Sequence, residues 1–237
     1  MEEFLIDGQT VSNKLIELAE NSNKSFTESL HPGIENILGV RIPDLRKLAQ
    51  RIARSNWSLY LEQAGTYFME ERILYGLVLG YIQPDIETEK YLQRVTHFVH
   101  LINSWSVCDT FSFGGGRTWL LQNSDKLWPY LKGWMTSSGE YQVRFGIVMA
   151  RKYFVDEIHL RELLQFLDQI KHDGYYVKMA VAWAISDCYV KFPCYTMEFL
   201  KYNNLDDFTF NKSLQKIIES FRVDVSDKLL IKKMKRK

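Results

Sequence analysis

The sequence predicts an all-α protein, and three observations support this fold class. Segments in which apolar residues recur with a helical period follow one another along most of the chain, separated by short polar breaks. No run of alternating apolar and polar residues is long enough to indicate a sheet. Helical segments of similar composition also recur at similar intervals, which is typical of proteins that stack helix pairs.

Local signals place the helices in order along the chain. Pro43 in "RIPDLRKLAQRIARS" suits the first turn of a helix in which Leu45, Leu48 and Ile52 form an apolar stripe. The same periodicity predicts further helices at 59–67, 70–82, 86–102, 126–135, 140–153, 157–169, 175–191, 208–220 and 226–235. With 46% hydrophobic residues, the 237-residue chain can bury the core of one domain that spans 1–237.

Three of the predicted helices resemble one another. "EERILYGLVLGYI", "YQVRFGIVMARKYF" and "YYVKMAVAWAISDCYV" each have a polar or aromatic start, a basic residue and an apolar helix with small residues. Arg72 and Arg144 are 72 positions apart, and Arg144 and Lys178 are 34 apart, as expected for paired-helix repeats of about 36 residues. We therefore expect a curved α-solenoid of HEAT-like antiparallel helix pairs, with one basic residue per repeat on its concave face.

The charge of the chain is unevenly distributed. The segment "KLLIKKMKRK" from Lys228 onward holds six basic residues and no acidic one, whereas residues 1–227 hold 24 basic and 29 acidic residues. Total charge therefore gives no support to nucleic-acid binding, which would require basic residues clustered on one face. We interpret the tail from about 228 as a solvated last helical turn rather than as a DNA-binding arm.

Composition also limits the compartment and the chemistry. Without a membrane span, a secretory signal or a C-x-x-C pair, we expect a cytoplasmic monomer whose cysteines, Cys108, Cys188 and Cys194, are free and mostly buried. His97 and His100 have no visible third ligand, so we expect no metal and no cofactor. The "GGGRTW" segment at 114–119 lacks the pattern of a phosphate-binding P-loop and is interpreted as a break between helices.

One short stretch, "NSWSVCDTFSFGGGRTW", raises the question of a site. If its start is helical, Trp105 and Asp109 project from one face, which places an aromatic ring beside a carboxylate. Such a pair suits a cationic ligand, but each residue type also has a packing explanation. Asp109 is equally suited to capping the next turn, Trp183 to burial in its apolar helix, and Arg144 to an ion pair with Glu140.

The order and spacing of four segments resemble a known family. "ILGVRIPDLRKLAQ", "NSWSVCD", "QVRFGIVMA" and "YYVKMAVAWAIS" together resemble the AlkD-type DNA alkylation repair proteins, which are built from HEAT-like repeats. The resemblance extends from about residue 37 to 221. Its most specific feature is that Arg144 lies 39 residues after Trp105 and Trp183 lies 39 residues after Arg144, with Asp109 one turn after the first tryptophan.

This resemblance implies a DNA partner and a set of roles. Active members of the family excise cationic N-alkylated purines, so Asp109 would be the catalytic carboxylate, flanked by Trp105 and Trp183 at the sugar and backbone of the lesion. Arg144 would hold a phosphate. The full set of expected nucleic-acid-binding residues is Arg144, Lys178, Arg72, Arg117 and Arg41.

The sequence departs from the family pattern near its N-terminus. In active members, a second N-terminal helix approaches the lesion, but here the matching stretch, 21–40, is interrupted by His31, Pro32 and Gly33. Because proline forces extended geometry on the residue before it, only short helical turns are expected there. Arg41 also stands where some members have a neutral polar residue. Three hypotheses follow: an alkylpurine glycosylase, a non-catalytic protein that binds branched or distorted DNA, and an α-solenoid scaffold that binds other proteins.

Overall fold

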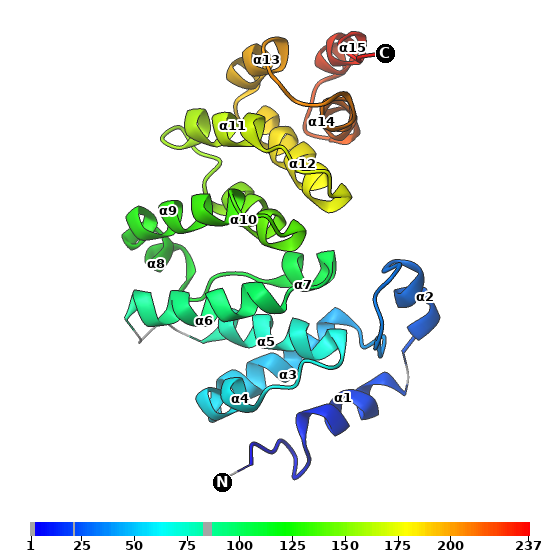
Figure 1. Cartoon of the computed structure of the whole chain (residues 1–237), viewed down its shortest axis with the longest axis vertical. Coiled ribbons are helices and arrows are strands. Elements are labelled where there is room, and N and C mark those ends of the chain that lie inside the picture. Colours follow the sequence, from blue (N-terminus) through cyan, green and yellow to red (C-terminus); the bar gives the residue numbers. More distant parts are fainter. Residues whose placement is uncertain (1–2, 21, 83–86) are drawn as a thin grey trace. The chain divides into compact units, whose positions relative to one another are not determined.

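The computed structural model describes residues 3–20, 22–82 and 87–237, which form fifteen helices (Figure 1). In chain order these are α1 Val11–Ala19, α2 Lys24–Ser29, α3 Ile42–Ala53, α4 Trp57–Gln63, α5 Met69–Tyr81, α6 Thr88–Leu101, α7 Trp105–Thr110, α8 Gly116–Gln122, α9 Ser124–Met135, α10 Glu140–Tyr153, α11 Leu160–Gln169, α12 Tyr175–Lys191, α13 Pro193–Lys201, α14 Asp207–Glu219 and α15 Val225–Lys233. Within these residues the only β pairing is an isolated bridge between Ile6 and Gln9. The all-α prediction is confirmed, and the helices pack as expected for an α-solenoid. Contacts along the chain group into two compact units, Met1–Ser124 and Asp125–Lys237.

Helix α5 lies at the centre of the first unit. It packs against α1, α3, α6 and α7. Most of its residues are buried, because these helices cover it on several sides. The buried carboxylate of Glu71 accepts hydrogen bonds from the backbone N–H groups of Tyr67 and Phe68 at 2.8 and 3.0 Å, which satisfies donors at the start of α5. It also accepts a hydrogen bond from Ser12 in α1. One acidic residue therefore caps α5 and ties α1 to it.

In the second unit, α12 packs against both α10 and α14 (Figure 1). Gly146 of α10 shows why this unit packs so closely. A Cβ atom at this position would lie 2.8 Å from the backbone nitrogen of Met135 and 2.9 Å from the carbonyl oxygen of Leu131, both in α9. Only glycine allows α9 and α10 to approach this closely.

The predicted helices all fall on observed ones, with ends that differ by up to four residues. The helix predicted at 157–169 begins later, at Leu160, because the carboxylate of Asp156 accepts hydrogen bonds from the backbone of Ile158 and His159 and stabilises a turn there. The start of the helix predicted at 86–102 lies outside the described residues. The prediction missed α1, α8 and α13. The segment 114–119, interpreted as a break between helices, contains the start of α8 at Gly116, and Pro193 occupies the first turn of α13, where proline is favoured.

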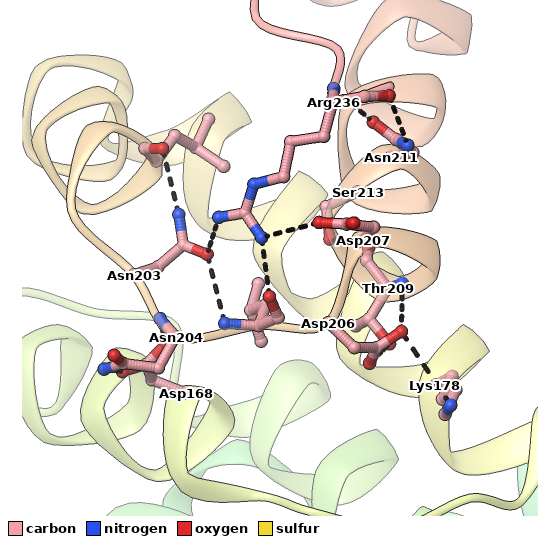
Figure 2. Close-up of polar contacts among 12 residues, drawn as sticks. Asp168, Lys178, Asn203, Asn204, Asp206, Asp207, Thr209, Asn211, Ser213 and Arg236 are labelled. Carbon is pink, nitrogen blue, oxygen red and sulfur yellow. Dashed lines mark hydrogen bonds and ion pairs between the residues drawn. The ribbon is translucent and has the colours of Figure 1, made fainter.

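Within the second unit, Arg236 holds the basic tail against the loop before α14, as Figure 2 shows. Its guanidinium donates hydrogen bonds to the carbonyl oxygen of Leu205 at 2.6 Å and to the side-chain oxygen of Asn203 at 3.0 Å. It also lies 4.0 Å from the centre of the Phe210 ring. The tail therefore ends on the loop before α14, while the side chains of Lys232 and Lys233, in the last turn of α15, stay exposed.

Candidate nucleic-acid interface

Trp105 and Asp109 lie one turn apart on the short helix α7, as predicted. The hydroxyl oxygen of Ser104 caps this helix by accepting a hydrogen bond from the backbone N–H of Val107 at 3.3 Å. The intervening residues of α7 are buried, whereas Trp105 and Asp109 are both partly exposed. Asp109 lies inside α7, and the residue that precedes α8 is Gly115, so Asp109 does not cap the next helix.

The environment of Trp105 includes a residue that the sequence did not single out as functional. The imidazole of His31 lies parallel to the indole of Trp105, with ring centres 4.9 Å apart and 4° between their planes. The indole N–H donates a hydrogen bond to the carbonyl oxygen of Leu30 at 3.2 Å. His31 and Trp105 are 74 positions apart, and no pattern in the sequence pairs them. The imidazole of His31, which lies where the helical pattern is interrupted, therefore stacks on the indole of Trp105.

The stretch around His31 contains only a six-residue helix, α2, which agrees with the short helical turns expected there. After α2 the chain turns at Gly33 and continues to α3 without helix or strand, with Asn36 and Gly39 at positive φ. The buried carboxylate of Glu70, at the start of α5, accepts hydrogen bonds from the backbone N–H groups of Leu38 and Gly39 at 3.0 and 2.6 Å. The stretch is therefore held against the core of its unit.

In the second unit, Trp183 is partly exposed and has cations on several sides. The guanidinium carbons of Arg144 and Arg151 lie 5.5 and 5.3 Å from the centre of its ring, and the ammonium of Lys216 lies 5.9 Å from it. Together with Trp183, these residues come from three helices, α10, α12 and α14, of which α12 packs against the other two. Cations at these distances are attracted to the face of an indole. Trp183 therefore belongs to a cationic cluster, not to the apolar core.

Arg144 itself is deeply buried, with only 2% of its surface exposed. It donates a hydrogen bond to the carbonyl oxygen of Tyr176 at 2.8 Å. The carboxylate of Glu140, the partner considered from the sequence, accepts a hydrogen bond from the backbone N–H of the same Tyr176 at 2.8 Å. Both side chains thus join α10 to the first turn of α12. The guanidinium of Arg144 is therefore engaged in contacts inside the protein.

The other two basic residues of the repeat are used in a similar way. Arg72 donates a hydrogen bond to the carbonyl oxygen of Leu101 at 2.8 Å, and burial lowers the pKa of its guanidinium. The ammonium of Lys178 lies 3.8 Å from the carboxylate of Asp206, the residue that caps α14 (Figure 2). At each of the three repeated basic positions, the side chain therefore joins its helix to a segment about 30 residues further along the chain.

Two of the predicted DNA-binding residues are exposed. Arg41 precedes α3 and forms an ion pair with Asp44 at 3.0 Å, with 73% of its side chain exposed. Arg117 lies in the first turn of α8 and is exposed. Both can approach a phosphate without breaking buried contacts.

Other chemistry has little support in the described part of the chain. It contains no group of three or more His, Cys, Asp or Glu side chains placed to hold a metal ion. Cys108 and Cys188 are buried and Cys194 is exposed, and all three are free, as predicted. Burial raises the pKa of the Cys188 thiol to about 12, which keeps it protonated. The backbone N–H of Gly114 donates to the hydroxyl of Tyr91 at 2.8 Å, so it is not available to a phosphate.

Comparison with known families identifies the chain. The model of the family described as DNA alkylation repair enzyme matches residues 11–217, which is most of the sequence. The chain belongs to this family. Membership of the DNA alkylation repair enzyme family indicates a role in the repair of alkylated DNA and makes DNA its partner. A comparison with curated proteins found no match. Among the described residues of this family member, no helix has the length and apolar content to cross a membrane.

Proposed function

We propose that the protein is a DNA glycosylase that releases cationic N3- or N7-alkylated purines. The observation that carries this proposal is the placement of Trp105 and Asp109 on the partly exposed side of α7, in a chain of the DNA alkylation repair enzyme family. An aromatic face and a carboxylate one turn apart match a substrate whose reacting centre develops positive charge.

The chemistry needs little more than a well-placed anion. An N-alkylated purine is already cationic, so it leaves as a neutral base when it takes the electrons of the N-glycosidic bond. The sugar then has oxocarbenium character, and the carboxylate of Asp109 stabilises that charge. A water molecule adds to the sugar carbon and gives up one proton, which Asp109 accepts and passes to solvent. No metal or cofactor takes part in this scheme.

The remaining predicted residues take supporting roles in the proposal. Trp105 contacts the sugar of the damaged nucleotide, and Trp183 lies along the DNA backbone. The phosphates next to Trp183 are bound by Arg151 and Lys216, whose side chains are 32% and 24% exposed. Arg144, which is buried beside Trp183, orients the indole. The exposed Arg41 and Arg117 add long-range attraction for DNA, with Arg72 and Lys178 contributing charge.

A second candidate is a protein that binds distorted DNA without excising a base. It is favoured by the short helix α2 and by the contact of His31 with Trp105, which leaves less of that indole open to a nucleotide. Both candidates require the cationic cluster around Trp183, and they differ only in whether Asp109 does chemistry.

One experiment separates the candidates. Purified protein is incubated with duplex DNA that carries N3-methyladenine or N7-methylguanine, and released base and bound DNA are measured in parallel. Base release that Asp109→Asn abolishes supports the glycosylase. Binding without release supports the second candidate. If the protein neither binds any duplex nor releases a base, both candidate functions are contradicted. The hypothesis of a protein-binding scaffold then remains.

A further inference from the structure

His31 is a buried polar side chain near the candidate site, and both of its ring nitrogens are hydrogen-bonded. Only 4% of its surface is exposed. Nδ1 lies 2.8 Å from the carbonyl oxygen of Thr27, and Nε2 lies 2.6 Å from the hydroxyl of Ser106. A carbonyl oxygen only accepts, so Nδ1 carries a hydrogen, and in the neutral ring Nε2 accepts from the hydroxyl of Ser106. These two bonds fix the plane of the imidazole.

The indole of Trp105 stacks on this imidazole. With 4° between the rings, the indole has one face against His31, and its N–H is bonded to the carbonyl oxygen of the neighbouring Leu30. The indole is therefore held by two contacts from the same short segment. Ser106, which holds the imidazole, is the residue next to Trp105 in α7. Ser106 of α7 holds the imidazole of His31, and the imidazole stacks on Trp105 of the same helix. His31 therefore orients the side chain of Trp105 relative to α7.

The segment that carries His31 is itself firmly placed. The backbone N–H of His31 donates to the carbonyl oxygen of Glu28 at 3.0 Å, and Ile34 closes a turn by donating to the carbonyl oxygen of His31 at 3.1 Å. Further along, the carboxylate of Glu70 holds the backbone of Leu38 and Gly39. Hydrogen bonds on both sides of Pro32 therefore hold the segment that carries the ring of His31.

We propose that His31 is a positioning residue: it fixes the indole of Trp105 beside Asp109 and leaves one face of that indole for the sugar of a damaged nucleotide. The sugar contact rests on the proposed function, but the orientation of Trp105 does not. Removing the imidazole leaves the indole free to rotate about its χ angles, so that fewer molecules present it in the reactive arrangement. The consequence for the reaction is a slower chemical step with little change in DNA affinity.

The test uses the full chain and the indole N–H resonance of Trp105, which is assigned by its loss in Trp105→Phe. In His31→Ala, we expect this resonance to shift and its exchange with solvent to become at least tenfold faster. His31→Phe keeps a ring beside the indole but loses both hydrogen bonds of the imidazole, so it should restore only part of the protection. Ser106→Ala, which removes one bond to the imidazole, should give an intermediate result. His97→Ala, an exposed histidine of the same unit, is the control and should change nothing.

Base release from DNA containing N7-methylguanine is measured on the same proteins. His31→Ala should slow single-turnover release at least tenfold, with DNA affinity changed less than twofold, and His31→Phe should recover part of the rate. An indole resonance that is unchanged in His31→Ala overturns the proposal whatever the activity, as does full base release by that variant. If the resonance responds as expected but the unmodified protein releases no base, the orientation of Trp105 by His31 stands and the glycosylase function fails.

Discussion

Arg151 donates a hydrogen bond from its guanidinium to the carboxylate of Asp187 at 2.6 Å, which joins α10 to α12. This bond holds the guanidinium against the ring of Trp183. The same carboxylate lies 3.5 Å from the guanidinium of Arg222, just beyond α14. If the cluster binds a DNA phosphate, Asp187 would therefore have two opposing effects: it orients one cation and repels the phosphate itself.

The first prediction concerns Arg151. If Arg151 binds a DNA phosphate, Arg151→Ala should weaken binding and reduce the slope of log affinity against log salt by about 0.9, the value for one released counterion. Lys201→Ala is the matched control, because Lys201 lies on α13 and forms an exposed ion pair with Glu198. Fluorescence anisotropy at several salt concentrations measures both variants. Equal effects of the two substitutions would mean that only total charge matters.

The second prediction concerns Asp187. Asp187→Asn keeps the shape of the side chain and removes the negative charge from among Arg151, Arg222 and the other cations of the cluster. Affinity for duplex DNA should rise severalfold at low salt, and the gain should shrink as salt screens the charges. The same anisotropy titration tests this. A fall in affinity would show that orienting Arg151 outweighs the repulsion.

The third prediction concerns the anchoring of the tail. Arg236→Ala removes the hydrogen bonds to Leu205 and Asn203 and the contact with Phe210, so it should lower the free energy of unfolding by about 1–3 kcal/mol. Lys237→Ala, next to it and exposed, should change stability by no more than about 0.5 kcal/mol. Urea denaturation followed by circular dichroism gives both values. Equal stabilities for the two variants would contradict an anchoring role.

The helices of this chain could be predicted because their signals are local. Apolar periodicity places α10 and α12 to the residue, and the four-residue spacing of Trp105 and Asp109 correctly places both on one side of a helix. The role of the repeated basic position could not be read in this way. Period alone identifies Arg144 as equivalent to Arg72 and Lys178, but the burial of its guanidinium depends on contacts that no local pattern encodes.

The stretch that contains His31 is a second case in which local signals predict the secondary structure but not the long-range contacts. Proline and glycine after His31 correctly predict that no long helix forms there. They do not indicate where the interrupted chain goes, because that depends on bonds such as those from Leu38 and Gly39 to Glu70, about 30 residues away. The stacking of His31 on Trp105 could therefore not be predicted from the helix break alone.

The fourth prediction concerns pH. The hydrogen bond from Lys132, followed by that from Trp128, lowers the pKa of the Glu162 carboxyl from its usual 4.5. A lowered pKa means that this carboxylate stabilises the fold above pH 4.5 and that the contribution disappears as pH falls through the folded-state pKa. Because 44% of the Glu162 side chain is exposed, water screens the interaction to about 0.5 kcal/mol or less. Urea denaturation at pH 7 and pH 3.5 should therefore show a smaller difference for Glu162→Gln than for the unmodified protein, and an equal difference would contradict it.

The last prediction separates chemistry from packing at Asp109. Asp109→Asn preserves shape and removes the charge that would stabilise an oxocarbenium-like sugar, so single-turnover base release should fall at least a hundredfold, on the order of 2.7 kcal/mol. DNA affinity should persist, because the proposed phosphate contacts lie elsewhere. If Asp109 is only structural, the substitution should instead cost about 1 kcal/mol of stability and leave activity in proportion to folded protein. Asp125→Asn, at an exposed position in the first turn of α9, makes the same chemical change away from the candidate site and should leave release intact. Only an active unmodified protein combined with a stably folded, inactive Asp109→Asn variant assigns the chemistry to this carboxylate.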